Sequence, residues 1–205
     1  MTRPRRCDDS GQAFPIYITV VAGLLFLAFA YLAVGQAAAN RNGAQTAADA
    51  AALAAAQETR DQLAGDWLEV VGDPAKWHDI LDGDTAVFDD CQRAYELAAQ
   101  NDADVQGCVP EGLLGYKVDV ETNKSVGDSI VPGTEDKHSK ASAIAVIEPL
   151  CPFDLPGEDA DAGDGNDPLP LPQLTCDDDT NWDPDPDDPS TLPDPEDLFD
   201  VHLAD

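Results

Sequence analysis

Residues 13–39 read AFPIYITVVAGLLFLAFAYLAVGQAAA, an uncharged and mostly apolar run close to the start of this 205-residue chain. A helix of about 20 such residues crosses the roughly 30 Å hydrocarbon core of a bilayer. The run has no polar face, whereas a helix at the surface of a soluble core has one. The sequence therefore predicts one transmembrane helix, with the long remainder of the chain on one side of the membrane.

The charges that flank this run predict its orientation. Residues 1–12 contain three arginines, and Arg41 is the one basic residue that follows closely. Short flanks rich in Lys and Arg stay in the cytoplasm, so we expect a cytoplasmic N-terminus and an extracellular C-terminus at the cell membrane. The main alternative is a cleaved secretory signal, because Ala37-Ala38-Ala39 resembles a small-x-small cleavage site. The length of the run favours a retained anchor.

The next stretch, residues 40–71, reads NRNGAQTAADAAALAAAQETRDQLAGDWLEVV. Alanine has the highest helix propensity, so the transmembrane helix is predicted to continue outward as an alanine-rich helix. Four of its alanines recur at helical spacing on one face: Ala44, Ala48, Ala51 and Ala55. Small side chains let helices approach closely, and we expect this face to pack against other helices of an assembly. The alternative is that these alanines cover the chain's own small domain.

Three segments of this region carry a resemblance to a known family. Gly11-Gln12 opens the apolar run, Asn42-Gly43-Ala44-Gln45 follows it, and residues 46–54 read TAADAAALA. Over roughly residues 10–60 the chain resembles the N-terminal region of TadE/TadG-like proteins of Flp (Tad) pilus-assembly systems, in their actinobacterial form. The resemblance implies a pilin-like or accessory component at the cell envelope, with other membrane or pilus-assembly proteins, or further copies of itself, as partners. It implies no catalytic residue.

One position departs from the pattern of the pilin-like members. Those members are cut after a glycine, and a glutamate stands five residues beyond the cut. A cut after Gly11 would place Ile16 where that glutamate belongs. Since the acidic side chain is missing, we expect an uncut resident membrane protein rather than a major fibre subunit.

Residues 72–153 are predicted to form a small α+β domain outside the membrane. Asp73-Pro74 is a favourable helix start, with the aspartate as N-cap and the proline in the first turn. Helical and alternating apolar patterns predict short helices at 75–81 and 86–100 and strands at 116–121 and 142–147. The expected arrangement is two or three helices against a small antiparallel sheet.

The five cysteines divide unevenly across the predicted membrane. Cys7 lies on the cytoplasmic side, where thiols stay reduced, and the other four lie outside, where disulfides persist. Three pairings of four cysteines exist, and sequence alone does not choose among them. Short separations are easy to close, so we favour Cys91–Cys108 and Cys151–Cys176.

Residues 154–205 form an acidic segment rich in Asp and Pro, and no Lys or Arg occurs after Lys140. Like-charge repulsion and regular prolines predict disorder from about residue 156 onward. The formal net charge of −30 argues against nucleic-acid binding. Residues 159–164 and 183–188 only partly resemble calcium loops, since glycine is missing or misplaced, so we expect weak, non-specific binding of divalent cations and a spacer role.

The sequence contains none of the common catalytic motifs for phosphate, ester or metal chemistry. Asp119 and Glu121 share one strand face, but in so acidic a chain a solvated face explains them. His138 lies in a polar stretch, and the histidines are too scattered to bind zinc with the cysteines. We therefore expect no enzyme, cofactor or metal site. Two alternatives remain open, a tethered binding module whose acidic segment captures cations or partners, and an exported soluble protein.

Overall fold

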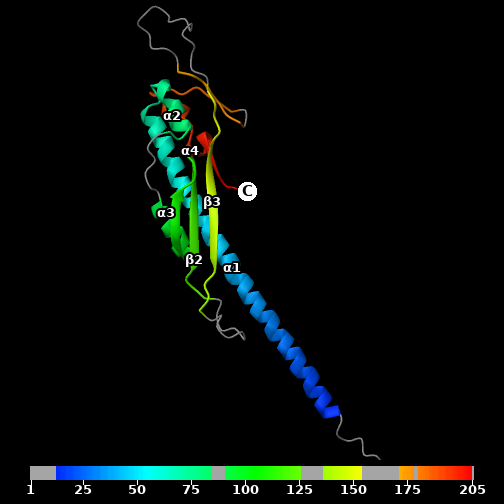
Figure 1. The fold of residues 1–205 in the computed structure, drawn as a ribbon. Coiled ribbons are helices and arrows are strands. Elements are labelled where there is room, and N and C mark those ends of the chain that lie inside the picture. The colour runs from blue at the N-terminus through cyan, green and yellow to red at the C-terminus, as the bar shows by residue number, and fades with distance from the viewer. Residues whose placement is uncertain (1–12, 85–90, 126–135, 154–170, 178–179, 205) are drawn as a thin grey trace, which may run out of the picture.

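The computed structural model describes residues 13–84, 91–125, 136–153, 171–177 and 180–204. In chain order the elements are α1 (Ala13–Glu69), η1 (Pro74–Lys76), α2 (Trp77–Leu81), α3 (Cys91–Gln100), β1 (Ala103–Pro110), β2 (Gly115–Thr122), β3 (Lys140–Pro149), β4 (Leu174–Thr175), β5 (Asn181–Trp182), η2 (Pro189–Thr191), α4 (Pro195–Leu198) and β6 (Phe199–Leu203). One half of α1 projects alone, and the other half packs against a sheet (Figure 1). The predicted combination of helices with an antiparallel sheet is confirmed.

Helix α1 continues without a break from the apolar run into the alanine-rich stretch, over 57 residues. Alanine and leucine dominate it, and both have high helix propensity. Pro15 lies in the first turn, where a missing backbone N–H costs no helical hydrogen bond. The two predicted helical segments are therefore one rod, which ends at Glu69.

The main sheet is antiparallel, with the strand order β1-β2-β3-β6. Its two central strands are those that the alternating patterns predict, and they pair with Val118 opposite Ala143. Strands β1 and β6 at the edges are additions to the predicted sheet. In β1 the register shifts between Val105 and Gly107, which marks a β-bulge.

The second half of α1 covers one face of this sheet and forms the core with it. The inward residues of β2, among them Tyr116, Val118 and Val120, are buried, whereas the outward residues between them are only half-buried. Strand β3 contributes small residues opposite α1, including Ala143 and Ala145. The sheet thus has one covered and one solvated face, which is usual for antiparallel sheets.

Aromatic residues close the end of the domain that lies farthest from the projecting helix. The ring centroid of Trp77 in α2 lies 5.2 Å from the ring centroid of Trp67 in α1 and 5.1 Å from that of Phe153. Trp77 Nε1 donates a hydrogen bond to the carbonyl oxygen of Val70 at 3.2 Å. Asp73 occupies the predicted N-cap position, but its side chain makes no capping hydrogen bond, and the segment begins as a 3-10 turn.

Helix α3 packs beside α1 and along strand β1. Its buried residues Cys91, Ala94 and Ala98 follow helical spacing, so one face of the helix is covered. The observed helix matches the C-terminal part of the predicted segment 86–100, and residues 85–90 lie outside the described part of the chain. After α3 the chain reverses at Asp102, whose φ of 56° is in the left-handed region that Asp tolerates in turns.

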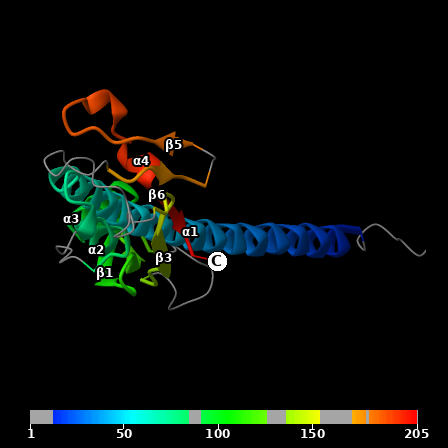
Figure 2. The same cartoon turned by 90° about the horizontal axis from the view of Figure 1, so that it is seen from above.

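The prediction that the acidic segment is disordered is wrong for its described residues. Strand β6 pairs with β3 from Phe199, opposite Pro149, to Leu203, opposite Ala145, and Phe199 is fully buried. Alternation explains this, because apolar residues point toward α1 while Asp200 and His202 point to solvent. Figure 2 shows β5 and the orange part of the C-terminal segment on one side of α1, with β1, β3 and the C-terminal end on the opposite side. Residues 154–170 of the predicted disorder lie outside the described part.

Candidate membrane and assembly surfaces

The first half of α1 exposes large apolar side chains around its whole circumference. Phe14, Phe26 and Tyr31 are 72%, 65% and 83% exposed, respectively. In the described part of the chain, α1 is the helix that is long and apolar enough to cross a membrane, and none of its most apolar window is buried. A core helix of a soluble protein would bury this window, so the surface is suited to lipid or to other apolar helices.

The folded domain begins directly where this apolar surface ends. The side-chain Nδ2 of Asn40 donates a hydrogen bond to the carbonyl oxygen of Lys124 at 2.9 Å. The hydroxyl of Thr122 lies 3.3 Å from Asn40 Oδ1 and donates to it. Since Asn40 follows Ala39, the last residue of the apolar run, the end of β2 lies beside the point where the helix leaves that run.

The four alanines that were expected to contact other helices lie inside the domain. Ala44, Ala48, Ala51 and Ala55 are all 0% exposed and belong to the core. Helix α1 packs mainly against strands β3 and β2 of the sheet. The inward residues of these two strands cover the alanine face of α1. The expected intermolecular role of this face is therefore corrected, because a fully buried face cannot contact a partner while the domain stays folded. The structure supports the alternative interpretation, in which the alanine face covers the chain's own domain.

The four cysteines that follow the apolar run form two disulfides in the pairing favoured from their spacing. Cys91–Cys108 joins the start of α3 to β1 across 17 residues, and Cys151–Cys176 joins the end of β3 to the C-terminal segment across 25 residues. Both cross-links lie in the part of the chain that is predicted to be extracellular. The second fixes β4 at the same end of the domain as Phe153.

The outward face of the sheet holds Asp119 and Glu121, the two carboxylates that share one face of β2. Glu121 lies 3.3 Å from the ammonium group of Lys140 and forms an ion pair with it. Asp119 points the same way, beside Gly107 and opposite Ser142 in the neighbouring strands. This arrangement is that of a solvated sheet face with cross-strand charge pairs.

His138 lies next to the end of β2 and takes part in the contacts that hold this turn. Its Nδ1 lies 2.6 Å from the carbonyl oxygen of Thr122, and the backbone N–H of Ser139 donates to the Thr122 hydroxyl at 3.1 Å. These contacts explain the polar residues here as supports of the turn. No group of three His, Cys, Asp or Glu side chains that could hold a metal occurs among the described residues.

The described aspartates of the C-terminal segment mainly stabilise their own turns. Asp185 Oδ1 accepts a hydrogen bond from the backbone N–H of Asp187 at 2.9 Å. The carboxylate of Asp188 accepts from both the hydroxyl and the backbone N–H of Ser190, and these two bonds lower the pKa of Asp188. The other stretch that partly resembles a calcium loop, residues 159–164, lies outside the described residues.

One comparison with known proteins gives a result for the N-terminal region. A family model described as "Putative Flp pilus-assembly TadE/G-like" matches residues 11–58. The match includes the exposed apolar half of α1 and the buried alanines that follow it, so the resemblance seen in the sequence is confirmed for this region. No curated protein and no solved structure matches the chain.

Proposed function

We propose that this chain is a non-catalytic, pilin-like or accessory component of a Flp-type pilus-assembly or secretion system. The observation that supports this most is the family match to residues 11–58, which coincides with the passage of α1 from its exposed apolar half into the core. The N-terminus is cytoplasmic in this proposal. Residues 13–39 cross the cell membrane, and the folded domain lies outside it.

The proposed mechanism is association, with the membrane segment as the contact surface. Because the alanine face is occupied by the chain's own sheet, partner helices would pack against the exposed half of α1. Small residues favour such packing in a membrane, where helices associate through close backbone approach. Gly23 and Gly35 lie in this half, and beyond the adjoining helix backbone a Cβ added at either would meet no atom of the described chain within 4 Å.

The two glycines provide a clean test of this mechanism. Gly23→Leu and Gly35→Leu should leave the domain folded, because the added side chains have open space around them. They should reduce co-purification with other membrane components of the pilus system after mild detergent extraction. Val34→Leu, a small change at a 70% exposed position of the same half, is the control. If both glycine variants retain their partners as the control does, association through these positions is excluded.

A second measurement distinguishes the resident protein from the processed alternatives. The proposal expects native membranes to yield a chain that starts at Met1 or Thr2, by N-terminal sequencing and intact mass. A start at Gln12 would mean prepilin-type cleavage despite Ile16, and would favour a fibre subunit. A start near Asn40, with the protein in the medium, would support the exported soluble protein and contradict the anchor.

The tethered binding module differs from this proposal in what its C-terminal segment does. In that alternative, exposed carboxylates capture cations or basic partners. The described carboxylates of Asp185 and Asp188 are already engaged by backbone N–H groups of their own turns. This engagement favours a structural role for the segment, so assembly is the preferred function.

A further inference from the structure

Residues 121–125, which read ETNKS, carry a feature that the assembly role does not use. In Asn123-Lys124-Ser125 an asparagine stands two positions before a serine, with no proline between them. This spacing is the acceptor pattern for N-glycosylation. No other asparagine in the sequence has Ser or Thr two positions later. Bacterial oligosaccharyltransferases also select an acidic side chain two positions before the asparagine, and Glu121 stands there.

The fold places this triplet at the surface, directly after strand β2. Thr122, the last residue of β2, is 6% exposed, whereas Asn123 and Lys124 are both exposed. The backbone N–H of Asn123 donates a hydrogen bond to the carbonyl oxygen of Asp102 at 2.8 Å. The main chain is therefore fixed while the side chain stays in solvent. An acceptor asparagine needs such a position, because the attached sugar is bulky and hydrated.

The side-chain amide of Asn123 is available for reaction. Asn40 and Asn101 use their side-chain amides to donate hydrogen bonds to backbone carbonyl oxygens, at 2.9 and 2.8 Å. The side chain of Asn123 makes no such bond within the part of the chain that the structure describes. The asparagine that has the acceptor spacing is thus also one whose amide the fold does not use.

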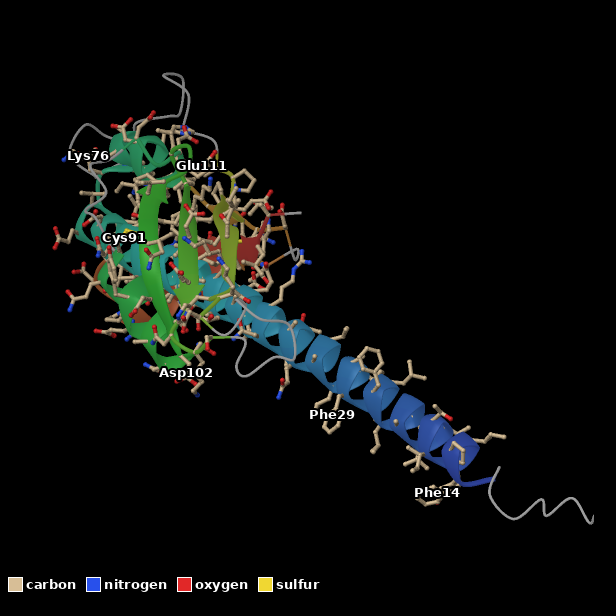
Figure 3. The ribbon with its side chains drawn as sticks, turned by 60° about the horizontal axis from the view of Figure 1, so that its bottom comes forward. Phe14, Phe29, Lys76, Cys91, Asp102 and Glu111 are labelled. Carbon is tan, nitrogen blue, oxygen red and sulfur yellow. A yellow bond between two sulfur atoms is a disulfide. The ribbon has the colours of Figure 1, made fainter. Side chains whose placement is uncertain are left out.

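The triplet lies beside the point where α1 leaves its apolar run. Asn40 Nδ2 donates hydrogen bonds to the carbonyl oxygens of Lys124 at 2.9 Å and Ser125 at 3.4 Å. Figure 3 shows Asp102, the backbone partner of Asn123, at the end of the domain from which α1 projects. The sugar donors of N-glycosylation are carried on membrane lipids. If residues 13–39 span the membrane, the acceptor amide lies on the side of the domain that faces these donors.

The compartment also agrees with this chemistry. N-glycosylation acceptors are found in surface loops of secreted or extracytoplasmic domains. In the proposed function the folded domain lies outside the membrane, where its disulfides Cys91–Cys108 and Cys151–Cys176 persist. The same placement would expose Asn123 to a transferase on that side.

From this arrangement we propose that Asn123 is an N-glycosylation site that accepts an oligosaccharide from a lipid-pyrophosphate donor. The side-chain nitrogen of Asn123 attacks C1 of the first sugar. The new bond joins this nitrogen to C1, and the bond between C1 and the pyrophosphate oxygen breaks. One amide proton passes to a base of the transferase, and the lipid pyrophosphate leaves, so no atom changes its oxidation state overall. The inference rests on the extracytoplasmic domain of the proposed function.

A sugar at Asn123 would also limit where partners can bind. It would cover the end of the domain nearest the membrane with a bulky, hydrated group. Contacts through the exposed apolar half of α1 would be unaffected, because they lie within the bilayer.

The test uses the full chain purified from native membranes, with its intact mass measured. The wild-type mass is expected to exceed the mass of the unmodified chain by that of an oligosaccharide, and fragmentation of the peptide that contains 121–125 should locate the sugar on Asn123. Asn123→Gln and Ser125→Ala should both lose this excess, whereas Ser125→Thr, which keeps a hydroxyl, should retain it. Asn42→Gln is the matched control, since Asn42 is also exposed but is followed by Gly43 and Ala44. It should retain the full excess.

Counting disulfides by alkylation reports whether each variant is folded and exported. A wild-type chain without the excess mass, a sugar located on Ser or Thr, or an excess that persists in Asn123→Gln would overturn the site. Reduced cysteines at 91, 108, 151 and 176 in an unmodified chain would contradict the extracytoplasmic domain, and the proposed function with it. An unmodified chain with both disulfides intact contradicts this inference alone.

Discussion

The hydroxyl of Thr59 donates a hydrogen bond to the hydroxyl of Tyr116 at 3.1 Å, and this bond joins α1 to the central strand β2 inside the core. The two residues are 1% and 3% exposed. They are 57 positions apart in the chain. The same helix that carries the exposed apolar run is thus fixed to the sheet by a specific buried polar contact as well as by apolar packing.

Tyr116→Phe should destabilise the domain, because it removes this bond and leaves the ring in place. Net contributions of buried hydrogen bonds cluster near 1 kcal/mol, so we expect the free energy of unfolding to fall by about 1 kcal/mol. Urea unfolding of the full chain in detergent, followed by tryptophan fluorescence, measures the change. Tyr95→Phe removes a hydroxyl at a 54% exposed position of α3 and serves as the control. Equal unfolding midpoints for the two variants would show that the buried bond contributes nothing measurable.

Ala51→Leu should destabilise the domain by overpacking the contact between α1 and the sheet. Ala51 is 0% exposed, and inserting methylenes into a packed core costs about 1–3 kcal/mol. The same unfolding experiment measures the effect, with Gln57→Leu on an exposed position of α1 as the control. An unchanged stability for Ala51→Leu would mean that this face of α1 is not packed against the sheet. The face would then again be a candidate contact surface for partner helices.

The two disulfides should leave a single reactive thiol in the mature chain. Alkylation of the denatured, unreduced protein is expected to add one label, at Cys7, and alkylation after reduction should add five. Replacing Cys91 and Cys108 together by alanine removes the cross-link between two residues that are 17 positions apart. This change should lower the free energy of unfolding by about 3 kcal/mol. Cys7→Ala should leave stability unchanged. Three or five labels before reduction would contradict the predicted cross-links or their compartment.

The long apolar helix, the central strands and the disulfide pairing could be predicted because each depends on local pattern or spacing. Residues 116–121 alternate clearly, and they became the middle of β2. The role of the alanine face could not be decided in this way. Helical spacing shows that Ala44 and Ala48 share a face, but the identity of the surface that covers it depends on the tertiary arrangement.

The missed strand β6 shows a different difficulty. Residues 154–205 are dominated by Asp and Pro, and composition over such a window predicts disorder. A short alternating stretch, residues 199–203, is nevertheless enough to pair with a preformed neighbouring strand, since β3 supplies backbone partners. The sequence of residues 199–203 does alternate, but the prediction of disorder followed the acidic composition of the whole window instead.

Phe199→Ala therefore gives the sharpest test of whether the C-terminal segment is part of the fold. Phe199 is 0% exposed and lies in the core with Leu198, so its truncation should cost about 3–5 kcal/mol of unfolding free energy. Asp200→Ala, at the next position and exposed on the opposite face of β6, should change stability by less than about 0.5 kcal/mol. A disordered segment would make the two substitutions equally harmless. A large loss confined to Phe199→Ala would instead mean that the C-terminal strand closes the edge of the sheet beside β3, and that truncating the acidic segment disrupts the domain rather than removing a spacer.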